Sequence, residues 1–291
     1  MALNKQIWVA QVMENFYPSD NFLTPVSDFS AFVENDTIHF AAAGIDPKVL
    51  INNTTYPISS VQRTDEDCQV KLDLFETENT IVRRPDAIEL SYDKLESVVG
   101  QHRNTLRKGV SMKAIHAFAP AKDSDDTPVI ETSGDLVEGR RRMKFDDLLT
   151  LKERFDAAEI PLEDRYIVLH PKHVTDLLRE DIKLFKNLTD IQEGEPFRFA
   201  GFGCYQFAFM PHYKQGSTGL EKVAFEDKNQ GEQFASVAFY AKEVMKADGV
   251  IHMYSKIDDP EERATIVGFD KRFVAMPIRG KGVGAIVSTL V

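Results

Sequence analysis

The chain has 291 residues, 43% of them hydrophobic, so it is long enough to bury one large core or two smaller ones. Its formal net charge of -11 and pI of about 5.2 argue against a protein whose main task is to grip phosphate backbones with clustered lysine and arginine. No apolar run has signal-peptide character at the N-terminus or approaches the roughly 20 residues of a membrane span. The two cysteines, far apart in sequence, predict neither a disulfide framework nor a cysteine zinc site. We therefore expect a soluble protein of a reducing cytoplasm.

The first segment, residues 1–35, is a poorly periodic mixture of aromatic and polar residues. Its aromatic residues stand among Asn, Ser, Asp and Pro, a composition that would make a weak domain by itself. We expect an arm that packs on something else and contributes little to the core of its own chain. The aromatic residues are Trp8, Phe16, Tyr17, Phe22, Phe29 and Phe32.

Residues 36–90 carry the signals of extended structure. In the run QVKLDLF, the apolar Val70, Leu72 and Leu74 alternate with Lys71 and Asp73, which is typical of a strand with one buried face. No helical pattern in the segment would cover the polar face, so we expect a long projecting hairpin. A two-stranded hairpin is marginally stable alone, and it should therefore find partners on another chain.

Helical periodicity begins after Ser91. An apolar stripe runs from Tyr92 through Val99 and Leu106 towards Phe118, which predicts one unusually long helix. The following stretch, residues 120–143, is rich in Pro, Asp, Ser and Gly and predicts a surface excursion.

The stretch DRYIVLHPKHVTDLL, residues 164–178, predicts a buried strand followed directly by a helix. Pro171 suits the first helical position, because its missing N–H costs nothing there. His170 and His173 around this proline have the spacing of a metal pair, but two ligands do not make a zinc site and no third ligand pattern lies nearby. We favour a strand-to-helix corner and keep a metal-dependent hydrolase using His170 and His173 as an alternative.

The remaining patterns mix helices and strands. We expect helices at 145–158 and 234–248, the second ending at Gly249. Strands are expected in FRFAGFGCYQFAFMP, GVIHMYSKI, RATIVGFDKRFVAMPI and GVGAIVSTLV. Because helices and antiparallel strands are mixed rather than alternating as βαβ units, the predicted fold class is α+β.

Three short motifs can be interpreted either as functional sites or as ordinary structural features. RGKGVGAIV lacks the spacing of a phosphate-binding loop and has no helix after it. The acidic DDPEER, residues 258–263, is better explained as a turn with solvated charges than as an acid–base pair. The one basic cluster is Arg140, Arg141, Arg142 and Lys144, which would contact nucleic acid or, as we prefer, form a solvated or intersubunit patch. No convincing active site emerges, so we predict no catalytic residue, cofactor or metal.

An aromatic arm, an extended hairpin and a long helix, in that order, resemble the major capsid proteins of tailed bacteriophages. The likeness spans most of the chain from Asp36 onward and rests on NNTTYPI, ELSYDKLESVVGQHRNTL, DRYIVLHPKHVTDLL, GFGCYQF, ASVAFYAKEVMKADG and DDPEERATIVGFDKRF. It implies the tailed-phage major-capsid fold. In that fold we expect an N-terminal arm at 1–35, an extended loop at 36–90, a peripheral domain with a long spine helix at 91–143 plus 262–291, and an axial domain at 144–261.

The resemblance also implies assembly without catalysis. Copies would form the hexamers and pentamers of an icosahedral phage or prophage head enclosing double-stranded DNA, a virion capsid assembled in the host bacterial cytoplasm. Implied partners are the chain itself, a separate scaffolding protein, portal and head-decoration proteins, and packaged DNA bound without sequence specificity, with no membrane. An encapsulin-type shell with protein cargo is the alternative. Candidates for assembly contacts are Trp8, Phe16, Tyr17, Tyr56, Lys71, Arg140, Arg141 and Arg142.

Two finer features of the resembling family bear on this chain. The sequence begins too close to the arm to include the cleavable scaffolding segment of some members, so we expect any scaffold to be separate. Other members cross-link a lysine of the extended loop to an asparagine of a neighbour. Lys48 and Lys71 are available here, but no motif identifies either, and we expect no cross-link.

Overall fold

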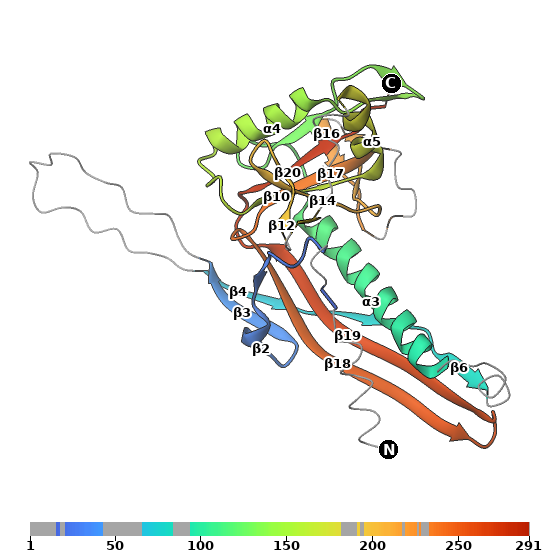
Figure 1. The fold of residues 1–291 in the computed structure, drawn as a ribbon. Helices are drawn as coiled ribbons and strands as arrows, with labels where there is room; N and C mark the ends of the chain where they lie inside the picture. The colour runs from blue at the N-terminus through green and yellow to red at the C-terminus, as the bar shows by residue number, and fades with distance from the viewer. Residues whose placement is uncertain are drawn as a thin grey trace, which may run out of the picture.

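A computed structural model describes residues 16–17, 21–42, 66–83, 94–181, 191–192, 195–216, 219–225, 227 and 233–290. Of the residues singled out above, Trp8, Lys48, Tyr56, Ser91 and Tyr92 lie outside this described part. Two lobes are visible in Figure 1. One contains a mixed sheet with two helices, and the other contains a long helix lying along a long β-hairpin.

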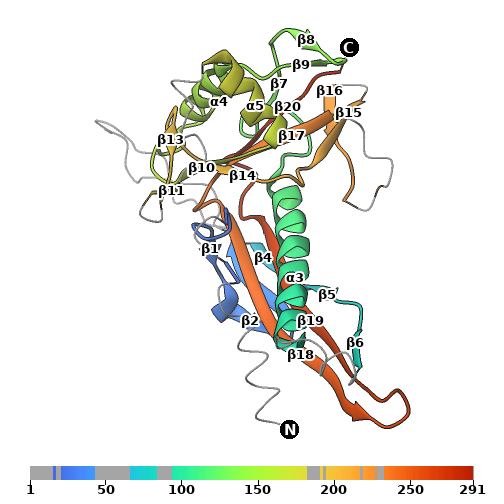
Figure 2. The same cartoon turned by 45° about the vertical axis from the view of Figure 1, so that its right-hand side comes forward.

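The hairpin lobe is organised by α3 (Lys94–Phe118), which lies along a five-stranded sheet (Figure 2). Its strands are β1 (Ser27–Asp28), β5 (Asp73–Glu76), β6 (Thr80–Arg83), β18 (Val244–Asp259) and β19 (Ala264–Pro277). The buried stripe of α3, including Val99, Leu106 and Phe118, joins Phe269 and Phe273 of β19 in the largest apolar cluster. The predicted long helix is confirmed, and burial of this stripe stabilises it.

The N-terminal segment does not behave as a detached arm. Phe16, Phe22, Leu23 and Val26 are all buried, and all four belong to the same cluster as the stripe of α3. Strand β1 pairs in parallel with β18, followed by the 3-10 helix η1 (Ser30–Phe32). The expectation that residues 1–35 contribute little to their own chain's core is therefore wrong for residues 16–17 and 21–28, because the chain itself buries Phe16, Phe22, Leu23 and Val26.

The expected extended region divides into two parts. Strands β2 (Val33–Glu34), β3 (Thr37–Ala42) and β4 (Glu66–Lys71) form a three-stranded antiparallel sheet, in which Thr37 lies opposite Lys71 and Ala42 opposite Glu66. The expected tip of this hairpin falls at 43–65, outside the described residues. Strands β5 and β6 do not project, because both pair with β19. The segment that follows the hairpin is thus part of the subunit's main body.

The second lobe contains an eight-stranded mixed sheet with α4 (Phe145–Ala157) and α5 (Pro171–Glu180). Both helices were expected, and both are present. The strands are β7 (Val129–Glu131), β10 (Arg165–Leu169), β13 (Arg198–Phe199), β14 (Phe202–Gln206), β15 (His212–Gly216), β16 (Gly219–Lys222), β17 (Gln233–Tyr240) and β20 (Val283–Val287). Two small hairpins complete the described elements: β8 (Leu136–Val137) with β9 (Arg140–Arg141), and β11 (Ile191–Gln192) with β12 (Glu195–Pro196). The α+β class is confirmed.

The helix expected at 234–248 is wrong. This stretch forms all but the first residue of β17 and the beginning of β18, joined by a short turn. Every residue of β17 is buried. A strand buried on both faces has apolar residues at nearly every position, so some of them also match the spacing of a helix. Gly249 does not end a helix. It lies in β18 at a register shift, where an added Cβ would come within 2.7 Å of the Arg272 Cβ.

The segment 120–143 is not only a surface excursion, since β7 pairs in parallel with β20 inside the eight-stranded sheet. β20 in turn pairs with β17, whereas β18 pairs with β19 along nearly its whole length. β7, β17 and β20 therefore belong to one sheet, and β18 and β19 to the other.

Candidate functional site

The corner between β10 and α5 places His173 inside the protein rather than at a site. Its side chain is fully buried, with Nδ1 2.7 Å from Ser236 Oγ and Nε2 2.9 Å from Ser288 Oγ. Burial holds the pKa of His173 well below its usual value, so the ring is neutral. Both ring nitrogens are occupied by hydroxyl groups of its own chain, which leaves neither for a metal ion.

His170 has a structural task at the same corner. Its Nδ1 accepts a hydrogen bond from the Lys172 backbone N–H at 3.1 Å, capping α5, and its ring stacks on Phe234 at 3.9 Å. Burial lowers the pKa of His170 to about 4, with a contribution from the positive charge of Lys172. Within the described residues no three His, Cys, Asp or Glu side chains gather as a metal site would require. The predicted strand-to-helix corner is confirmed.

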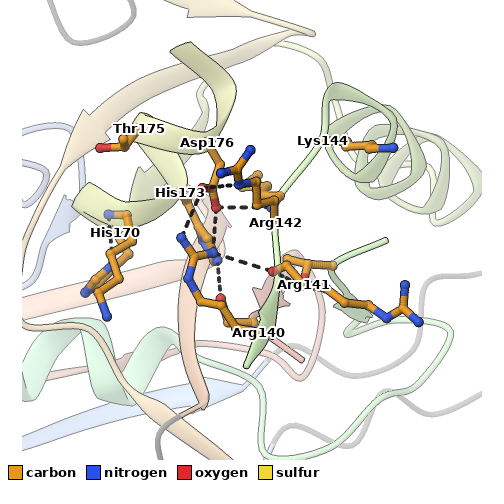
Figure 3. A network of polar contacts seen from close by, with 12 residues as sticks. Arg140, Arg141, Arg142, Lys144, His170, His173, Thr175 and Asp176 are labelled. Carbon is orange, nitrogen blue, oxygen red and sulfur yellow. Dashed lines mark hydrogen bonds and ion pairs between the residues drawn. The ribbon is translucent and has the colours of Figure 1, made fainter. Parts of the chain in front are cut away.

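The basic cluster is partly neutralised by an acidic residue of α5 (Figure 3). Arg140 forms a bidentate pair with Asp176, with Nη1–Oδ2 at 2.6 Å and Nη2–Oδ1 at 3.0 Å. The Asp176 carboxylate is inaccessible to solvent, and the Arg140 side chain is only 14% exposed. Arg142 Nε lies 4.0 Å from the same carboxylate, and the Met143 backbone N–H donates to it at 3.3 Å. Arg140 therefore ties β9 to α5 and has little surface left for a partner.

Arg141 and Lys144 differ from their neighbour. Both side chains extend away from Asp176 in Figure 3, and the Arg141 residue is exposed. The backbone of Arg141 is fixed by bonding to the last segment of the chain, its N–H donating to the Thr289 carbonyl at 2.9 Å. Within the basic cluster Arg141 is exposed, and Arg142 and Lys144 are half-buried, so these three residues can present charge at the surface.

The aromatic candidates Phe16 and Tyr17 contact two buried lysines. Lys271 of β19 forms an ion pair with Asp248 of β18, and its Nζ lies 4.4 Å from the centroid of the Phe16 ring. The Tyr17 hydroxyl donates to Asp248 Oδ1 at 2.9 Å, and Lys246 Nζ lies 4.2 Å from the Tyr17 ring. Burial and the neighbouring Asp248 charge both raise the pKa of Tyr17. These side chains fasten the N-terminal segment to β18 and β19.

Sequence reasoning did not find the partner residues of these contacts. Lys246, Asp248 and Lys271 belong to long strands, and Asp176 belongs to a helix, where charged residues normally indicate solvent. Only the ion pairs and hydrogen bonds seen in the structure show that these four side chains point into the protein. The remaining candidate, Lys71, ends β4 and is exposed, so its role in assembly stays a prediction.

Among the described helices, none combines the length and apolar character needed to cross a lipid bilayer. The candidate residues that the structure describes therefore fall into two groups. Some are held inside the subunit by packing, helix capping or ion pairs, and the others are exposed.

Comparison with known proteins identifies the fold. No protein-family model and no curated protein matches the sequence. Among solved structures, the capsid of cyanophage P-SCSP1u aligns with a TM-score of 0.63 at 16% identity, covering 91% of this chain and 86% of that one. The capsid of a native GTA particle gives 0.61 at 8% identity, covering 92% and 90%, and a virus-like particle from Pyrococcus furiosus gives 0.59 at 10% identity, covering 97% and 99%. The chain therefore has the fold of tailed-phage major capsid proteins, as its motif order indicated.

Proposed function

We propose that this chain is the major capsid subunit of a tailed phage, assembling into the hexamers and pentamers of an icosahedral head that encloses double-stranded DNA. The observation that carries the proposal is the alignment of at least nine-tenths of the chain with shell-forming subunits from a cyanophage, a GTA particle and a virus-like particle. A likeness that covers nearly the whole subunit leaves little of the chain for another activity.

Two features of the subunit fit this role. The β3–β4 pair extends from the body as the base of a hairpin, and a strand pair of this kind gains stability by packing on a neighbour. The hairpin lobe and the mixed-sheet lobe also give the subunit an elongated form that can meet several neighbours at once (Figure 1). We assign the hairpin lobe to the peripheral part of a capsomer and the mixed-sheet lobe to its axial part.

The partners follow from the same role. The chain would assemble with itself, with a separate scaffolding protein guiding curvature, and portal and head-decoration proteins joining the completed shell. The particle would assemble in the cytoplasm of a host bacterium and end as the capsid of a virion.

Negative-stain electron microscopy of the expressed full-length chain, alongside size-exclusion chromatography, tests the proposal. We expect closed shells, or rings of five and six subunits, with or without added scaffold. A monomer or dimer that never assembles under any of these conditions would refute it.

The Pyrococcus furiosus particle supports a second candidate, a shell that holds protein cargo, because it covers the largest share of this chain among the three comparisons. Particles purified from cells after nuclease treatment distinguish the two. Protected double-stranded DNA supports the phage head, whereas a co-purifying protein inside DNA-free shells supports the cargo compartment.

A further inference from the structure

The long helix α3 differs in charge from the rest of the chain. The whole sequence has 46 acidic and 35 basic residues, yet α3 has neither Asp nor Glu from residue 97 to its end. The basic residues in that part are Arg103, Arg107, Lys108 and Lys113. Lys113 forms an ion pair with Asp73 of β5, with Nζ 3.5 Å from Oδ2. This part of α3 therefore carries basic but no acidic side chains in an otherwise acidic chain.

A pocket of about 240 Å³ lies beside this helix, between α3, residues 21–22 and residues 206–207. Its polar lining consists of Asn21, Asn104, Arg107, Lys108, Ser111 and Gln206. These side chains supply guanidinium, ammonium, amide and hydroxyl donors, and no carboxylate lines the pocket. A lining of this composition is complementary to an anion.

The two cations of the pocket are positioned by neutral neighbours. Lys108 Nζ lies 3.9 Å from the centroid of the Phe209 ring, which itself contacts Phe207 edge to face. Arg107 Nη2 donates to Asn104 Oδ1 at 3.3 Å. In the described part of the chain neither cation forms an ion pair, so both charges are available to a ligand while their side chains are already oriented.

We propose that this pocket binds a backbone phosphate of nucleic acid, and that the α3 surface around it faces the DNA inside the shell. The inference rests on the proposed function, because a DNA-filled particle presents closely spaced phosphates to its inner wall. Arg107 can bind two phosphate oxygens through its planar fork while Lys108 adds a point charge. The net charge of the subunit is -11, so most of its surface does not favour DNA.

Binding of a labelled 30-base-pair duplex to the purified full-length protein, measured over a series of salt concentrations, tests the assignment. The variant is Arg107→Gln with Lys108→Gln, and the matched control is Arg198→Gln with Lys214→Gln, which removes the same two charges from exposed positions of β13 and β15. We expect the first pair to weaken binding roughly tenfold or more and to lower the salt slope by about one, since the pocket is assigned one phosphate and each lost phosphate contact lowers the slope by about one. Equal effects of the two pairs would overturn the proposal, because they would show only a net-charge effect.

Two further measurements separate phosphate binding from loss of folding and from binding of acidic protein. Arg107→Lys keeps the charge but loses the fork, so it should keep the salt slope while weakening binding, and it covers the case in which the double variant fails to fold. Polyglutamate is used as a competitor. If it displaces the duplex at equal charge concentration, the surface recognises acidic protein segments instead, and the nucleic-acid assignment fails.

The placement of the pocket is tested with closed, DNA-free particles. Free subunits should bind added duplex through Arg107 and Lys108, whereas closed particles should not, because the pocket faces inward. Binding of external duplex to closed particles, abolished by the double variant, would overturn the inward placement. If the protein forms no particles, the proposed function is refuted. If it forms normal particles but the Arg107→Gln, Lys108→Gln variant binds DNA as well as its control, only this inference is refuted.

Discussion

Lys271 illustrates how single residues fix the arrangement of this subunit. Its ammonium group is buried between two strands, and it is compensated by Asp248 and by the face of the Phe16 ring. A buried ion pair adds little stability compared with apolar packing, but an unpaired buried charge is costly. The N-terminal segment is therefore held at one place along β18 and β19, because only there do Phe16 and Tyr17 cover both lysines.

His170 gives the subunit a defined response to acid. An unfolded histidine binds its proton below about pH 6.5, whereas folded His170 does so only at about pH 4. Between these values the unfolded state binds more protons, so stability falls as pH falls, by up to about 1.4 kcal/mol per pH unit for one group. His170→Asn keeps a side-chain cap for α5 but does not titrate. Urea unfolding at intervals from pH 7 to pH 4 should show a shallower loss in this variant, and an identical slope would contradict the assignment.

At the scale of elements, residues 21–34 act as a structural strap across the hairpin lobe. The Phe29 N–H donates to the Lys246 carbonyl at 2.8 Å, and the Asp248 N–H donates to Ser30 Oγ at 2.9 Å. Lys246 Nζ returns a bond to the Leu23 carbonyl at 2.7 Å. The strap and β18 therefore satisfy each other's polar groups, while the apolar side chains of the strap fill the space beside α3.

Two phenylalanines of this segment distinguish the strap from a detached arm. Phe22 is buried, whereas Phe32 is 61% exposed. Phe22→Ala should destabilise the subunit by about 3–5 kcal/mol through lost burial and a cavity. Phe32→Ala should stay within about 0.5 kcal/mol. Denaturant midpoints of unassembled subunits measure both, and two equally small changes would show that the segment does not pack on its own chain.

The sequence allowed elements with one clear period to be predicted. α3, α4 and α5 were predicted because each has a polar and an apolar face, and α5 also has Pro171 at its start. β17 was misread because burial on both faces removes the period that separates strand from helix. The contact of Arg140 with Asp176 and that of Tyr17 with Asp248 were not predictable, because each joins residues far apart in the chain.

At the scale of the whole molecule, the two lobes are joined where α3 ends. Lys222 Nζ donates to the carbonyls of His116 and Ala119 at 2.9 and 2.5 Å, and the Tyr213 hydroxyl donates to the Pro120 carbonyl at 2.6 Å. These bonds satisfy carbonyl groups that a helix end leaves without partners. Burial lowers the pKa of Lys222 to about 8. The orientation of the hairpin lobe relative to the mixed sheet thus depends on β15 and β16 as well as on the chain connections.

Two adjacent arginines separate folding of this molecule from its assembly. Arg140→Met leaves the buried Asp176 carboxylate without its bidentate partner, which should lower the stability of the subunit by about 3–5 kcal/mol. Arg142, whose Nε lies 4.0 Å from the same carboxylate, should reduce this loss. Arg141→Glu reverses an exposed charge, so it should leave the unfolding midpoint nearly unchanged but slow or reduce particle formation, because surface charges mainly tune association. Urea unfolding of subunits and light scattering during assembly, read together for both variants, measure the two effects. Normal assembly of Arg141→Glu would remove Arg141 from the intersubunit contacts, and an unchanged midpoint for Arg140→Met would show that the pair with Asp176 does not hold β9 against α5.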